Sequence, residues 1–179
     1  LFNHPAVVLR LLRAGADTKL RSESGKSALQ LAKEQGHVAC VEAFRQHVAE
    51  VTASQREAAA GGAGRREAAA RGAGGASSGE AASSGSLGSL SVEAAVAAAR
   101  GDEAALLAWL DSDGQVNATC GVGNASGITA LMYAAVNGHE RVVELLLRHG
   151  ADIDLQRSDG GTALMGAALP SHKRLVRLL

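Results

Sequence analysis

The sequence predicts an all-α solenoid of stacked helix–turn–helix units, and three observations support this prediction. A Gly-x-Thr-Ala-Leu motif at residues 127–131 returns at residues 160–164, so that Thr129 and Thr162 are 33 positions apart. Self-similarity at a fixed period is the signature of repeat architectures. The motif at residues 127–131 is followed by apolar residues at helical spacing. Aromatic residues make up only 2% of the chain, and a core of Leu, Val and Ala suits short, closely packed helices.

The repeat pattern divides the chain into two predicted modules and a linker. Residues 1–48 contain half a repeat and one terminal repeat, because Arg45 stands where an internal repeat has leucine. Residues 49–89 are mostly Ala, Gly and Ser and predict a flexible linker, whose start through about Ala60 can extend the preceding helix. Residues 90–179 hold about two repeats and a truncated third. Both ends cut through a repeat, which suggests a fragment of a longer protein.

Local signals place the helix starts and the core of the repeats. A hydroxyl side chain at a helix start can accept a hydrogen bond from a free backbone N–H, and the expected caps are Ser27, Ser91, Thr129 and Thr162. The predicted core of the most regular repeat, residues 126–158, consists of Leu131, Ala134, Ala135, Val142, Val143, Leu145 and Leu146.

The first predicted helix departs from this pattern. Leu9 and Arg10 occupy the positions that Glu144 and Leu145 occupy in the regular repeat, so the polar and apolar residues are exchanged. This exchange predicts a helix that is rotated or imperfectly packed.

Four histidines could be read as metal ligands or as catalytic bases. His4, His37, His139 and His172, however, fall at the same place in successive repeats. A side chain that recurs with the repeat is expected to be structural, with its ring hydrogen-bonded to loop backbone. Pro170 and Ser171 replace the Asn-Gly pair that precedes His139, which puts the tight turn before His172 in question.

Several classes of function are disfavoured. The 18 basic and 18 acidic residues balance, so no strong field attracts nucleic acid or an anionic membrane. The glycine-rich segment 121–127 lacks the Lys-Ser/Thr of a phosphate loop, and no strand is predicted before it. The Cys and His spacings fit no zinc site. We therefore expect no catalytic residue, metal, cofactor or small-molecule substrate.

Composition also bears on the expected compartment. Cys40 and Cys120 are expected to be free thiols in a reducing environment. No apolar run approaches the roughly 18 residues that would span a bilayer, and no signal peptide is visible. These features predict an intracellular protein, cytoplasmic or nuclear, without membrane insertion.

The ordered motifs of residues 127–160 resemble the ankyrin repeat. The Gly-x-Thr-x-Leu entry, Ala-Ala, Gly-His, Val-Val, Leu-Leu-Leu and Gly-Ala-Asp all occur in sequence. Ala130 and Met132 stand where that family usually has Pro and His. The resemblance implies helix–turn–helix units with projecting β-hairpin loops, and binding of partner proteins on the concave face.

We therefore expect a non-catalytic scaffold that binds protein partners. The alternatives are a targeting or regulatory arm of a larger enzyme, such as a kinase or ubiquitin ligase, and a purely structural spacer. The family's contact positions are hairpin tips and exposed ends of first helices, and Tyr133 is the expected exposed anchor. In this chain, the contact positions that the resemblance implies are Arg21, Glu23, Ser24, Lys26, Glu34, Gln35, Ile128, Tyr133, Val136, Asn137, Gln156, Ser158, Asp159 and Leu169.

Overall fold

The computed structural model describes residues 4–60, 89–123 and 125–169. Pro170, Ser171, His172 and most of the predicted linker lie outside these ranges. In chain order, the described elements are α1 (Pro5–Arg13), α2 (Ala28–Glu34), α3 (Val38–Ala60), α4 (Val92–Arg100), α5 (Glu103–Asp111), β1 (Thr119–Val122), β2 (Ala125–Thr129), α6 (Ala130–Asn137), α7 (Glu140–Arg148) and α8 (Ala163–Ala168).

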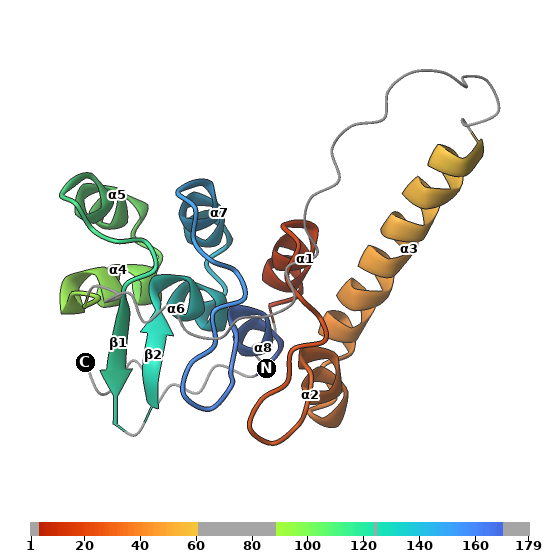
Figure 1. Ribbon diagram of the computed structural model, residues 1–179, viewed down its shortest axis with the longest axis horizontal. Coiled ribbons are helices and arrows are strands. Elements are labelled where there is room, and N and C mark those ends of the chain that lie inside the picture. The colour runs from red at the N-terminus through yellow and green to blue at the C-terminus, as the bar shows by residue number, and fades with distance from the viewer. Residues whose placement is uncertain (1–3, 61–88, 124, 170–179) are drawn as a thin grey trace, which may run out of the picture.

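The helices pack in pairs whose spatial order differs from their order in the sequence. Figure 1 shows an inner row in the order α4, α6, α8 and α2, and an outer row in the order α5, α7, α1 and α3. The pairs are α4 with α5, α6 with α7, α8 with α1, and α2 with α3. The third unit thus combines helices from opposite ends of the described chain. The described parts of residues 1–48 and 90–179 lie in one helix–turn–helix solenoid.

The predicted caps are confirmed. The side-chain oxygens of Ser27, Thr129 and Thr162 accept hydrogen bonds from backbone N–H groups three residues later, at 3.3–3.4 Å. Ser91 accepts one from the N–H of Ala94 at 3.2 Å. Because an unpaired N–H at a helix start costs free energy, these hydroxyls fix where the four inner-row helices begin.

The predicted core is confirmed for six of its seven residues. Leu145 is half-buried and packs against the core, whereas Leu131, Ala134, Ala135, Val142, Val143 and Leu146 are buried. Alanines dominate the buried face of α4, and their small side chains permit the close contact between α4 and α6.

The exchanged residues of α1 do not disturb its packing. Val7, Val8, Leu11 and Leu12 are all buried. Arg10 forms ion pairs with Glu144 and, at 3.9 Å, with Glu140 on the neighbouring α7. Val7, Val8 and Leu11 are buried like the equivalent Val142, Val143 and Leu146 of α7, so the expectation of a rotated or imperfectly packed helix is wrong. The unusual position of Arg10 brings its guanidinium to an acidic neighbour.

The terminal helix α3 extends through Ala60, as predicted. It packs on α1 and α2, but Val38 is 75% exposed and Val48 is 60% exposed. An apolar side chain that is left in water at the end of a stack is typical of a unit with no neighbour on that side. This exposure agrees with the prediction that residues 22–48 form an edge repeat.

Three of the four equivalent histidines connect successive units, and their structural role is confirmed. Each ring hydrogen-bonds the backbone near the end of the inner helix in the preceding unit. The contacts are His139 Nε2 to the Ala99 carbonyl at 2.9 Å, His4 to the backbone of Val136, and His37 Nδ1 to the Ala168 carbonyl at 2.8 Å. These contacts follow the spatial order of the stack.

The loops also bond from one unit to the next. The backbone N–H of Asp152 donates to Asn117 Oδ1 at 2.8 Å, and that of Asp17 donates to Asp154 Oδ1 at 2.9 Å. The loop between α5 and α6 contains the antiparallel hairpin of β1 and β2, which pairs Cys120 with Ile128. The expectation of no strand before the glycine-rich segment is wrong, because β1 begins at Thr119 and enters it.

Gly138 should be essential to the contact between the second and third units. Its φ is +79°, and an added Cβ would lie 2.0 Å from His4 Nδ1. At Gly150, φ is +83° and nothing lies within 4 Å of an added Cβ. We expect Gly150→Ala to cost about 1–2 kcal/mol through backbone strain alone. Gly138→Ala should cost at least about 1 kcal/mol more, because the His4 hydrogen bond is lost. Urea unfolding measures both, and equal losses would contradict the role of His4.

Acidification should weaken the stack through His4. Burial, followed by the nearby charge of His139, lowers the pKa of His4 despite its bond to the Val136 backbone. At a pH between the folded and unfolded pKa values, His4 therefore binds more protons in the unfolded chain than in the folded one. The contribution of His4 to stability is complete above its unfolded pKa of about 6.5. It declines as the pH falls from there through the lower folded pKa. Unfolding free energies at pH 7.5 and 5.0 should differ less in His4→Gln than in the wild type. His149→Gln, which replaces an exposed histidine, serves as the control.

Candidate partner-binding groove

A groove of about 250 Å³ lies between the inner helices of three successive units and two of their loops. We call it the inner groove. Apolar residues of α2, α6 and α8 contribute Leu31, Met132, Val136, Met165, Gly166 and Leu169, and the two loops contribute Ser22, Ser24, Arg157, Asp159, Gly161 and Thr162. The groove therefore joins an apolar floor to a polar rim.

The floor depends on side chains that recur with the repeat. Met132 and Met165, the only two methionines in the chain, are 33 residues apart and hold equivalent places in α6 and α8. Both are nearly buried, while Val136 and Leu31 are half-buried. An added Cβ at Gly166 would lie 2.7 Å from Val136 Cγ2. Glycine at that position thus lets the Val136 side chain lie against α8.

An ion pair marks the polar rim. Arg157 Nε donates to Asp159 Oδ1 at 2.5 Å, and the backbone N–H of Gly161 donates to the same oxygen at 3.0 Å. Partial burial works to raise the pKa of the Asp159 carboxyl. The bonds from Arg157 and Gly161, together with the charge of Arg157, nevertheless hold that pKa below its usual value. The Asp159 carboxyl therefore stays ionised at neutral pH.

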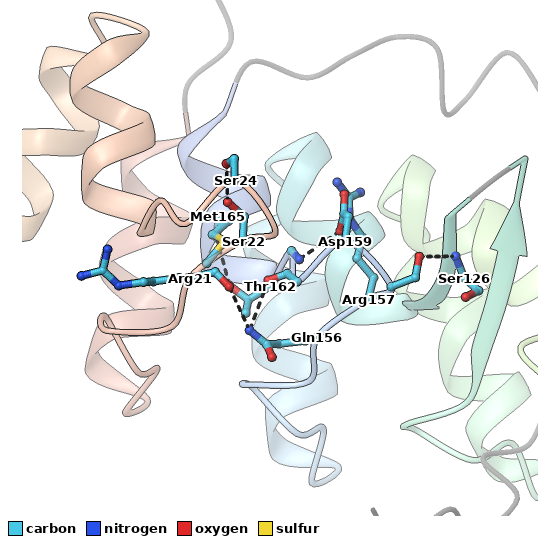
Figure 2. A network of polar contacts seen from close by, with 12 residues as sticks. Arg21, Ser22, Ser24, Ser126, Gln156, Arg157, Asp159, Thr162 and Met165 are labelled. Atoms are coloured by element: carbon cyan, nitrogen blue, oxygen red, sulfur yellow. Dashed lines mark hydrogen bonds and ion pairs between the residues drawn. The ribbon is translucent and has the colours of Figure 1, made fainter. Parts of the chain in front are cut away.

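Hydrogen bonds fix the loops that form the rim, and Figure 2 shows them side by side. Gln156 Nε2 donates to the carbonyls of Arg21, at 3.4 Å, and Gly160, at 3.2 Å. The backbone N–H of Ser126 donates to Ser158 Oγ at 3.1 Å. The N–H of Ser158 donates in return to the Ser126 carbonyl at 2.9 Å. The rim is thus tied across three successive loops.

The structure brings some of the expected contact residues together at the groove. Val136, Asp159, Leu169 and Ser24 line it. The remaining ones have other surroundings. The loops are joined to one another by Arg21, Glu23, Gln156 and Ser158. Lys26 and Glu34 form an exposed ion pair at 2.6 Å, and Gln35 is the exposed C-terminal cap of α2. The Asn137 amide donates to the Tyr133 carbonyl at 2.8 Å.

Two of the expected contact residues are not on the surface. Tyr133 is 2% exposed and Ile128 is 3% exposed. The Tyr133 hydroxyl lies 3.6 Å from Cys120 Sγ on β1, and burial followed by this contact raises its pKa. Tyr133 therefore supports the hairpin from within the core, and its expected role as an exposed anchor is wrong. Every residue from Ala130 to Ala135 is buried, so the Tyr133 side chain is not accessible to solvent.

Sequence reasoning missed most of the groove's apolar floor and Arg157. One signal was available, because both methionines of the chain occupy the same repeat position. Leu31 gave no comparable signal, since it joins the floor only when α2 packs beside α8.

The cysteines and acidic residues show no further chemistry within the described ranges. Cys40 is buried and Cys120 is half-buried, and both are free thiols. Burial raises the pKa of Cys40. Among the residues that the structure describes, no group of three or more His, Cys, Asp or Glu could hold a metal ion. No helix in the described parts is long and apolar enough to cross a membrane.

Comparison with known proteins gives a consistent result. Residues 94–179 match the family model for ankyrin repeats, in three copies. A 61-residue stretch, 34% of the chain, is 46% identical to ankyrin repeat domain-containing protein 29 of Danio rerio. The match spans only 20% of that relative. No solved structure matches significantly. Ankyrin repeats are generally protein–protein interaction modules. In agreement with the helix pairs, caps and histidine contacts described above, residues 94–179 thus match the ankyrin-repeat family.

Proposed function

We propose that the chain binds a partner protein by receiving an extended peptide segment in the inner groove. The single observation that supports this most strongly is the apolar floor. Half-buried side chains from three successive units, Leu31, Val136 and Leu169, lie there between polar loops. A ligand side chain on this floor would remove apolar surface from water on both partners.

The size and flexibility of the floor indicate which side chain fits. A groove of about 250 Å³ accommodates one or two aliphatic side chains of a peptide. Met132 and Met165 lie beneath it, and unbranched thioether side chains adapt to differently shaped apolar groups. The proposed segment therefore carries a leucine, isoleucine or methionine at its centre.

The rim supplies polar contacts for the peptide backbone. The hydroxyls of Ser22 and Ser24 lie 2.7 Å apart at the edge of the groove, and Arg157 and Asp159 carry opposite charges on the other side. Such a rim offers both donors and acceptors, which suits a peptide better than a polyanion. The repeat fold places this rim without any contribution from the ligand, so little ordering is required on binding.

The test is peptide selection with a matched pair of variants. The double variant Leu31→Lys and Val136→Lys places charges on the floor. The control, Val92→Lys and Leu107→Lys, changes two exposed apolar residues away from the groove. Each protein, checked for folding by circular dichroism, is presented with a phage-displayed library of random dodecapeptides. We expect wild type and control to select peptides with a central aliphatic residue, and the floor variant to bind them at least about tenfold more weakly. Equal binding by the floor variant would contradict the proposal.

A further inference from the structure

The third unit of the stack is completed by a segment that the sequence period does not assign to it. A step of 33 residues from His139 leads to His172. In the structure, His4 makes the corresponding contact, with the backbone of Val136. The outer helix of that unit is accordingly α1, which packs on α7 and α8. Two segments of this chain thus carry the signal for one position.

Residues 172–179 match the apolar pattern of the outer helices. The buried residues Val142, Val143 and Leu146 of α7 have counterparts 33 residues later, where the sequence has Leu175, Val176 and Leu179. In α1 the counterparts are Val7, Val8 and Leu11, which are fully buried. Both segments therefore offer a histidine followed, at the same spacing, by the three apolar residues that this position buries.

We propose that the face of α7 and α8 covered by α1 is a docking site with an exchangeable occupant, for which residues 172–179 of the same chain compete with α1. This exchange does not depend on which peptide the inner groove binds. It follows from the equivalence of the two segments and from the position that α1 holds.

Each segment has its own advantage. Residues 172–179 follow α8 within a few positions, as α7 follows α6, and closing a short loop costs less entropy than closing a long one. In contrast, α1 comes from the other end of the chain but brings α2 and α3 with it. His37 then bonds the Ala168 carbonyl at 2.8 Å, and α2 packs on α8.

One contact is specific to α1. Arg10 pairs with Glu144 and Glu140 of α7. The residue at the position of Arg10 in the competing segment is Leu178, which cannot form this pair. Neutralising the two glutamates should therefore weaken the docking of α1 selectively.

Exchange would change what the molecule presents to a partner. Release of α1 exposes the apolar side chains that it buries, among them Val7, Val8, Leu11 and Leu12. It also withdraws α2 from α8, and with it the Leu31, Ser22 and Ser24 side of the inner groove. The occupant of the docking site would thus determine whether the groove is complete.

Hydrogen exchange of the full chain, followed by mass spectrometry, tests the competition. The variant Leu175→Ser with Val176→Ser weakens the competing segment. Lys173→Ser with Arg174→Ser is the control, because their counterparts on α7, Glu140 and Arg141, are exposed. We expect the first variant to slow amide exchange in residues 5–13 several-fold, and the control to leave it unchanged.

A third variant weakens the docking of α1 instead of that of residues 172–179. Glu140→Gln with Glu144→Gln should speed exchange in residues 5–13 and slow it in residues 172–179. The proposal is overturned if weakening residues 172–179 leaves the exchange of α1 unchanged or makes it faster, or if the glutamate variant changes both segments in the same sense.

Discussion

A helix of six to nine residues is too short to be stable alone in water, so each short helix here depends on the neighbours that cover its apolar face. α8 shows this most clearly. It is a six-residue helix with five buried residues, and it packs against α6, α1 and α2. Stability is therefore a property of contacts between units, as in other solenoids. Removing one neighbour removes the burial on which the next helix depends.

Polar contacts give this apolar stacking its direction and register. His4, His37 and His139 each reach back to the preceding inner helix. Loop N–H groups donate to Asn117 and Asp154 of the preceding loops. Apolar faces of Leu, Val and Ala tolerate sliding more readily than a hydrogen bond with a fixed partner does. The hydrogen bonds therefore fix which unit follows which, and the same bonds hold the loops that form the rim of the groove.

Much of the local structure could be predicted because it is encoded over short stretches. The hydroxyl caps, the helix extension to Ala60, the buried leucines and valines, and the structural histidines all follow from residue type and period. The order of the units could not be predicted, since a period describes what a repeat needs but not which segment supplies it. The burial of Tyr133 was missed for a related reason. Its position in the repeat suggested exposure, whereas the β1–β2 hairpin between α5 and α6 covers it in the structure. The groove floor similarly requires α2 and α8 to be neighbours, although they are far apart in the chain.

The pairing of α1 with α8 has a consequence for the order in which the chain acquires its fold during synthesis. The ribosome releases α1, α2 and α3 first, yet the inner helix against which α1 packs is the last described element to emerge. Until then the apolar faces of α1 and α2 have no native cover on that side, and transiently exposed apolar surface favours aggregation. A circularly permuted gene that encoded residues 89–169 before residues 4–60 would make each unit from consecutive residues. It would let the stack grow from one end as translation proceeds.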